Sequence, residues 1–269
     1  MKNFFICLLL GSYVTASSQE LFVYSEPASN MAAKGIGFRV NNTLMKIDGS
    51  NKYNFHTVPE LMFGISKNIM VHVDAFLSNR NKSLVAEGGS LYFKYRFYSE
   101  DEVHSHFRMA AYSRASINNS DIHQPAINLY GHNSGFETGI IATKLIDKVA
   151  ISAGVAHLYA SNNSKGNKFI YGDKFRNAIG YNLSVGKLML PKEYTDYKQT
   201  NVNLMMEVLG QTNLESGKSY LDLAPSLQFI FLSQMRLDIG YSFPVVNKLE
   251  RTASRGALLR LEYNIFNAF

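Results

Sequence analysis

A histidine and a serine stand two residues apart in the segment INLYGHNSGFETG, with a glycine on either side of the pair. On a β-strand, His132 and Ser134 would lie on one face, near enough for the imidazole to accept the serine proton. Such a pair acts as base and nucleophile in ester hydrolysis when a third group orients the imidazole. Asn119, or Asp121 just beyond it, is the candidate for that role. Polar residues and glycine are also common where a strand begins, so a purely structural interpretation stays open.

The elements that would position this pair are β-strands, because hydrophobic residues alternate with period two from about residue 33 onward. In GGSLYFKYRFYS, for example, apolar and aromatic residues alternate with Lys94 and Arg96 on the other face. No linker or repeat divides the chain. The predicted strands cover residues 33–43, 54–65, 68–78, 87–98, 106–118, 133–145, 148–159, 176–187, 199–210, 218–231, 234–245 and 256–269.

The apolar face of these strands points to lipid. Away from the strand ends, and with two strands trimmed before Lys144 and Lys187, it carries no charged residue, although Lys, Arg, Asp and Glu make up 18% of the chain. A cation facing the bilayer midplane costs about 2–4 kcal/mol, which explains the absence. Short and long connections also alternate, as in barrels with one periplasmic and one external end. We therefore expect an all-β fold, a transmembrane antiparallel β-barrel of about twelve strands, in the outer membrane of a Gram-negative bacterium. Its partners would be outer-membrane lipids.

The N-terminus has the features of an export signal. Lys2 precedes an apolar core, and small polar residues follow it, so residues 1–19 are predicted to be a signal peptide. The only cysteine, Cys7, lies in that core, which removes disulfides and thiol chemistry from the mature chain. A lipoprotein anchor at Cys7 is the rival interpretation. Residues 20–32 would form an N-terminal segment able to plug the barrel, and residues 33–269 the barrel itself.

The inward face of the predicted barrel is rich in charge. Seven basic and seven acidic residues balance, so they are expected either to pair across a filled interior or to line a polar pathway without ion preference. Glycine, alanine and serine dominate the inward positions of the sixth to eighth strands, which predicts a cavity there or room for the N-terminal segment. The predicted lumen-lining residues are Arg39, Glu60, Asp74, Lys94, Arg96, Arg108, Arg114, Glu137, Glu207, Asp222, Arg236, Asp238, Arg260 and Glu262.

Other chemistry finds little support in the sequence. The net charge of +6 comes without a basic block, so nucleic acid is not an expected partner. The seven histidines are scattered, and no Walker loop, dinucleotide fingerprint or zincin motif is present. We therefore expect no metal and no cofactor.

Three long segments resemble a family of small outer-membrane β-barrel proteins of Bacteroidota that has no established activity. These are SEPASNMAAKGIGFRV, AEGGSLYFKYRFYSEDEVHSHFRMAAYSRASINNSDIHQPAINLYGHNSG and SVGKLMLPKEYTDYKQTNVNLMMEVLGQTNL. The resemblance implies location and fold, and it transfers no catalytic residue. The final strand, LLRLEYNIFNAF, resembles the C-terminal signal read by the outer-membrane assembly machinery, which makes that machinery an expected partner through Phe269.

A shorter resemblance concerns the His-Ser pair. HNSG resembles the histidine-x-serine stretch of outer membrane phospholipase A, a twelve-stranded barrel whose serine attacks phospholipid esters from the outer wall. Extending the strand parity puts His132 and Ser134 on the lipid-facing side, near the outer leaflet. The position matching that enzyme's orienting asparagine is Ile146, which departs from the pattern.

The sequence thus predicts a passive small-solute transporter or a structural barrel, and leaves the oligomeric state open. The alternative is a phospholipase or esterase in which Ser134 is the nucleophile, His132 the base and Asn119 the orienting group. A secreted soluble β-barrel that binds a lipophilic ligand is a third hypothesis.

Overall fold

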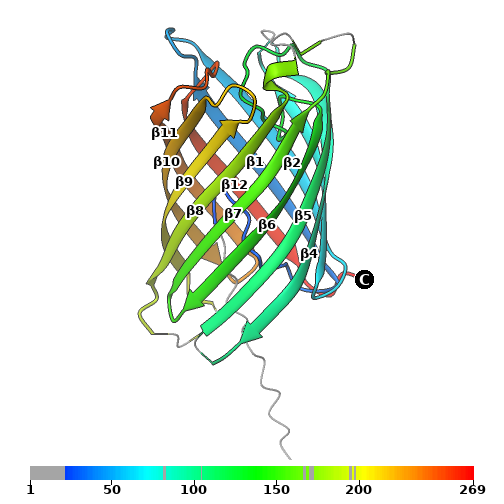
Figure 1. Cartoon of the computed structure of the whole chain (residues 1–269). Coiled ribbons are helices and arrows are strands. Elements are labelled where there is room, and N and C mark those ends of the chain that lie inside the picture. The colour runs from blue at the N-terminus through cyan, green and yellow to red at the C-terminus, as the bar shows by residue number, and fades with distance from the viewer. Residues whose placement is uncertain are drawn as a thin grey trace, which may run out of the picture.

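Twelve antiparallel strands close into a single barrel (Figure 1), in a computed structural model that describes residues 22–80, 83–103, 105–165, 168–169, 173–193, 196 and 198–269. The predicted signal peptide, residues 1–19, lies outside the described residues. Each strand pairs with its neighbours in sequence, and β1 pairs with β12. The strands are β1 (Gly35–Lys46), β2 (Tyr53–Gly64), β3 (Ile69–Ser78), β4 (Val85–Asp101), β5 (Ser105–Asn118), β6 (Gly135–Ile146), β7 (Val149–Ala160), β8 (Asn177–Leu190), β9 (Asn201–Asn213), β10 (Ser219–Phe231), β11 (Met235–Asn247) and β12 (Arg255–Ile265). A short 3-10 helix, η1 (Asp173–Phe175), precedes β8. No helix among the described residues is long and apolar enough to cross a membrane.

The strands bury one face and expose the other. In β12, exposed and buried residues alternate without interruption from Arg255 to Ile265. Leu259 and Leu261 point outward with about half of their surface exposed, whereas Arg260 between them is buried inside the barrel. Apolar side chains therefore face out and charged ones face in, the reverse of a soluble domain.

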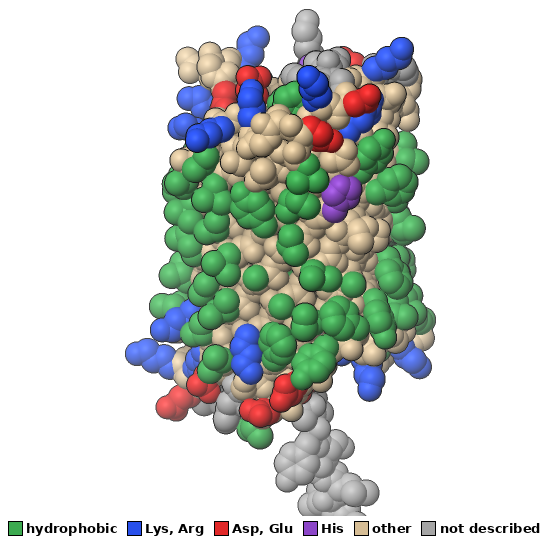
Figure 2. Space-filling model, in the orientation of Figure 1, with side chains coloured by type: hydrophobic (Ala, Val, Ile, Leu, Met, Phe, Trp, Pro, Cys, Tyr) green, Lys and Arg blue, Asp and Glu red, His purple; other side chains and the backbone are tan. Residues whose placement is uncertain are grey.

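Hydrophobic side chains form a belt around the middle of the barrel, and lysine, arginine and acidic residues gather at its two ends (Figure 2). Such a belt suits contact with hydrocarbon, and closure of the sheet leaves no strand edge with unpaired backbone groups. The predicted fold class, a transmembrane antiparallel barrel of twelve strands, is confirmed.

The two ends of the barrel differ in their connections. The turns between β2 and β3, β6 and β7, and β10 and β11 are short and lie at the end where the chain terminates (Figure 1). The connections that follow β5 and β7 are long, and the strand ends that they join lie at the opposite end. The prediction that the last strand runs to Phe269 was wrong, because β12 ends at Ile265. Asn267 has a φ of 52°, and the N–H of Ala268 donates to the carbonyl of Lys34 instead of continuing the ladder.

The N-terminal segment, residues 22–34, lies inside the barrel as far as residue 31 (Figure 1), and its last three residues, which precede β1, are exposed. Phe22 and Val23 pack against inward side chains of β6, β7, β9 and β12 and are each only 2% exposed. Ala28, fully buried, fits beside Thr143 of β6. The small residues of the wall make this possible, because Ser184 of β8 leaves room for the hydroxyl of Ser25 at 2.8 Å.

Candidate functional site

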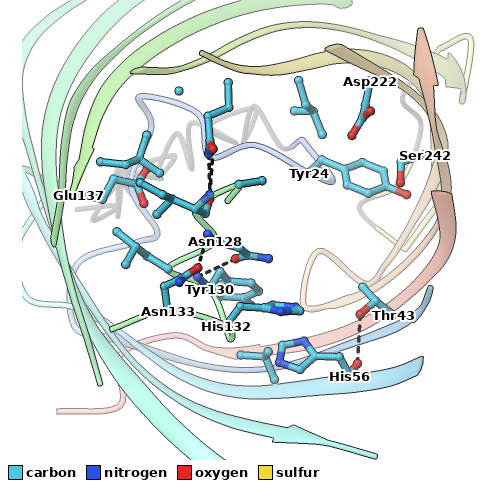
Figure 3. Close-up of a pocket in the computed structure, with 18 of the residues that line it drawn as sticks. Tyr24, Thr43, His56, Asn128, Tyr130, His132, Asn133, Glu137, Asp222 and Ser242 are labelled. Atoms are coloured by element: carbon cyan, nitrogen blue, oxygen red, sulfur yellow. Dashed lines mark hydrogen bonds between the residues drawn. The ribbon is translucent and has the colours of Figure 1, made fainter. Parts of the chain in front are cut away.

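A cavity of about 510 Å³ lies inside the barrel. Residues 23–26 of the N-terminal segment border it on one side, and residues 121–133 of the β5–β6 loop border it on another. Figure 3 shows Tyr24 beside Ser242 of β11, and Tyr130 and His132 of the loop near His56 of β2. Small residues of β7 and β8, including Gly154 and Gly180, form part of its wall. The small-residue side of the barrel thus holds both a cavity and the N-terminal segment.

The β5–β6 loop folds into the mouth of the barrel because buried polar groups of the wall satisfy its backbone. Gln211 of β9 accepts from the N–H of Ile127 at 2.9 Å and donates to its carbonyl at 2.7 Å. Ser116 donates to the carbonyl of Leu129 at 2.5 Å. Gly131 has a φ of 121° and lies against the ring of His56, where a Cβ would come within 2.2 Å of that ring. Only glycine suits this position.

Arg80, in the β3–β4 connection, ties the loop to the wall. Its guanidinium bonds Nδ1 of His132 at 2.7 Å and the carbonyl of Gly131 at 3.0 Å, and it forms an ion pair with Glu87 of β4. Burial and the charge of Arg80 hold the pKa of His132 well below its usual range, with His56 and His123 adding to the effect. His132 is therefore neutral at pH 7 and accepts the bond from Arg80 through Nδ1.

The charged residues around the cavity are paired. Arg39 reaches three carboxylates, those of Glu26, Glu60 and Glu262, at 2.8, 3.4 and 2.7 Å. Arg114 meets Asp74 at 2.7 Å. The guanidinium of Arg114 also makes cation-π contacts with two tyrosines, 5.0 Å from the ring centre of Tyr92 and 4.8 Å from that of Tyr130.

Two further pairs follow the same pattern on the other side of the barrel. Arg251 meets Asp222, and Arg260 meets Asp238, each at 2.5 Å. Of the fourteen predicted lumen residues, all are buried inside the barrel except Arg96 and Glu137, which are half-buried. Arginine–carboxylate pairs therefore neutralise much of the charge in the interior.

Sequence reasoning missed four members of these pairs, namely Glu26, Arg80, Glu87 and Arg251. Arg80 and Arg251 lie in connections and Glu26 in the N-terminal segment, where no strand periodicity indicates a direction. Glu87 lies at the irregularity in the pairing of β4 with β3, where the register skips it. No sequence signal that we recognise would have placed them.

The predicted catalytic pair does not assemble on the lipid-facing wall. Ser134 is 6% exposed, and its Oγ accepts from the N–H of Asn118 at 2.8 Å and lies 3.2 Å from the carbonyl of that residue. The outward-facing positions begin only at Phe136, which is 60% exposed. The parity prediction for His132 and Ser134 was wrong because β6 begins at Gly135, whose φ of 146° breaks the alternation.

The predicted orienting groups also have other roles. The backbone N–H of Asn119 donates to the carbonyl of Glu87 at 2.7 Å. Asp121 lines the cavity instead of the outer wall. The hydrogen bonds of His132 and Ser134 run to Arg80 and Asn118, so the geometry does not support hydrolysis of membrane lipid.

One cluster could in principle hold a cation. Glu60, His72 and Asp74 are buried and offer one ligand atom each within 4.8 Å of one another. Arg39 and Arg114 already donate to the two carboxylates. A divalent cation would have to lie beside both guanidinium groups, so we assign no metal to this cluster.

No family model matches the chain, and no curated protein matches it. Among solved structures, it is similar to an outer membrane channel from Pseudomonas putida F1, with 12% identity and a TM-score of 0.56 over 91% of this chain and 100% of that one. A weaker likeness is to the NanC porin, with 9% identity and a TM-score of 0.47 over 84% and 97%. At such identity the first likeness shows the fold alone. The shared fold and the apolar belt both support the predicted outer-membrane location.

Proposed function

We propose that this chain is a channel-like barrel of the outer membrane that passes small polar solutes without energy input, and that the cavity is its outer solute site. The observation that carries the proposal is the cavity of about 510 Å³ inside a membrane-type barrel. Pockets for small molecules have volumes of about 300–1,000 Å³. The cavity borders residues 251–253 and the β5–β6 loop, at the end with long connections, which in such barrels faces outside.

The lining favours uncharged or zwitterionic solutes. Each arginine described above is matched by carboxylates, so the wall offers no net charge to attract one sign of ion. Tyrosine rings from β4, β5 and β10 also line the cavity and offer both apolar faces and hydroxyls. Solutes with hydroxyl or amide groups fit such a surface better than simple ions do.

The N-terminal segment must move for a solute to cross. Phe22, Glu26 and Pro27 line a second, small cavity of about 30 Å³, while Val23 to Glu26 line the large one. The segment therefore lies between the two spaces. A structural barrel without conduction is the second candidate, and the dense hydrogen bonding of this segment to the wall is the observation that favours it.

A disulfide lock separates the two candidates. Ser25→Cys with Ser184→Cys, in a Cys7→Ser background, would join the segment to β8, where the two hydroxyls are now 2.8 Å apart. Purified protein is placed in planar bilayers and in liposomes loaded for solute-swelling assays. We expect conductance and sugar-driven swelling in the reduced protein and neither in the oxidised protein. The Ser25→Cys single variant, treated with the same oxidant, is the matched control.

A folded barrel that conducts in neither redox state, and that still fails to conduct after removal of residues 22–32, would refute the channel and favour the structural role.

A further inference from the structure

The lumen wall holds the N-terminal segment mainly by its backbone. The carboxylate of Glu207 on β9 accepts from three consecutive N–H groups, those of Val23 and Tyr24 at 2.8 Å and that of Ser25 at 2.9 Å. Arg260 on β12 donates to the carbonyls of Phe22 at 2.7 Å and Val23 at 2.8 Å. One acid and one base thus bind opposite polar groups of the same stretch, which bends at residues 23–25 so that three successive N–H groups converge on one carboxylate.

A second set of contacts holds the next part of the segment. The ammonium of Lys94 on β4 donates to the carbonyls of Pro27 at 2.8 Å and Ser29 at 2.9 Å. Thr143 on β6 accepts from the N–H of Ala28 at 2.9 Å. Four strands therefore contribute a donor or acceptor aimed at the main chain of residues 22–29.

Two of these wall residues, Lys94 and Glu207, depend on the segment for their main partners. Lys94 and Glu207 have 0% exposure. Within the described part of the chain, the anionic partner of Lys94 is Glu26, at 3.5 Å, which belongs to the segment. Apart from the segment, the hydrogen-bond partner described for Glu207 is the hydroxyl of Ser184, at 3.1 Å. A buried charge without a partner is strongly unfavourable, so the wall is suited to a bound peptide and not to an empty lumen.

Side-chain recognition is limited to few positions. Glu26 meets Arg39 at 2.8 Å, and the hydroxyl of Ser25 donates to Glu207 at 2.7 Å. Gly186 and Gly240 lie where the rings of Phe22 and Tyr24 approach the wall. The ligand that these groups specify is a peptide that bends after its first residue and carries aromatic residues followed by a hydroxyl and an acidic side chain.

We infer that Lys94, Thr143, Glu207 and Arg260 form a peptide-binding site in the lumen, occupied in cis by residues 22–29, and that this site also binds a peptide of the same chemistry in trans. Exchange of the occupant controls access from the cavity to the other end of the barrel. That consequence rests on the proposed channel function, whereas peptide binding itself does not.

The first test uses the full chain. A single cysteine at position 29 (Ser29→Cys, Cys7→Ser) reports release of the segment through its rate of reaction with a small maleimide, since Ser29 is 5% exposed. Loss of hydrogen bonds to a charged group in Glu207→Gln should raise that rate about tenfold or more. Glu87→Gln is the matched control, because Glu87 is an equally buried carboxylate that contacts Ser78 and Arg80 and not the segment. Equal rates in the parent and Glu207→Gln would overturn the inference.

The second test uses a barrel that lacks residues 22–32 and a fluorescent synthetic peptide, FVYSEPASNMA. Saturable binding that is lost in Glu207→Gln and absent with a scrambled peptide is the expected result. A folded barrel that does not bind the peptide would overturn the inference.

If this variant does not fold, the peptide is added in excess to the Ser29→Cys full chain. Faster maleimide labelling then supports exchange, and an unchanged rate contradicts it. Conductance is recorded in parallel, so peptide binding without conduction would reject the channel and keep the binding site.

Discussion

Ser134 lies with its Oγ 2.8 Å from the backbone nitrogen of Asn118, and this bond joins the last residue before β6 to the end of β5. The nucleophile of a lipase needs a free, exposed hydroxyl, whereas this one closes a buried contact. Ser134→Ala should leave a buried N–H without a partner and destabilise the barrel by about 1–3 kcal/mol. Thermal unfolding in detergent measures the shift. Ser113→Ala, which removes an exposed hydroxyl from β5, should have little effect.

The same variants test hydrolysis. We expect no release of fatty acid from phospholipid by the refolded parent protein. Release by the parent that Ser134→Ala abolishes and Ser113→Ala retains would contradict the structural role given to Ser134.

Docking of the β5–β6 loop should depend on pH through His132. Its pKa in the folded state lies well below the usual histidine value, so protons bind preferentially when the loop is undocked. The contribution of His132 to docking is complete above about pH 6.5, the ordinary histidine pKa, and is lost as the pH falls below it toward the folded pKa. The protection factors of residues 122–133 in hydrogen exchange, corrected for the pH dependence of the intrinsic exchange rate, should therefore fall from pH 7.5 to pH 5. His132→Gln should reduce this pH dependence. A variant with the same pH profile as the parent would contradict the role given to His132.

The packing of the N-terminal segment against the barrel wall should be sensitive to an added methyl group. A Cβ on Gly64 would lie 2.1 Å from the carbonyl oxygen of Ala32, so Gly64→Ala should destabilise the protein by about 1–3 kcal/mol through overpacking. At Gly186 the nearest atoms to an added Cβ are 3.4 and 3.5 Å away, in ordinary contact. Gly186→Ala should thus be tolerated. Thermal unfolding of the two variants measures the difference. Equal losses of stability would contradict the close packing described at Gly64.

The apolar belt should reject charge. Leu259, at the middle of β12, is 44% exposed on the outer face. Leu259→Lys should lower the free energy of folding into a bilayer by about 2–4 kcal/mol, as expected near the midplane. Val103, 88% exposed in the turn between β4 and β5, provides the control, since Val103→Lys stays in water. Urea titrations of folding into lipid vesicles give both values. Similar effects at the two positions would show that the belt does not face hydrocarbon.

Strand periodicity was sufficient to predict the barrel, because burial on alternate sides is imposed residue by residue along each strand. It also indicated the inward direction of Arg39, Glu207 and Arg260. It failed at His132 and Ser134 because both residues precede Gly135, where β6 begins. On that side of Gly135 the chain turns into the lumen and no longer alternates between the two faces of a strand.

The remaining contacts depend on distant chain segments. Nothing near Glu207 in the sequence indicates that its partners are residues 23–25, about 180 positions away. Arg80 and Arg251 likewise act from connections whose path is set by the groups they meet. Such contacts follow from the closed barrel and not from local pattern.

The bonds from Arg260 and Glu207 to residues 22–25 also impose an order on assembly. The segment is made first, yet the two residues that bind it lie on β12 and β9, so its seat is incomplete until the last strand has paired with β1. Contacts of such long sequence separation form late, because a large loop must close before they are made. The complete set of bonds to the N-terminal segment therefore requires the last strand to be in place.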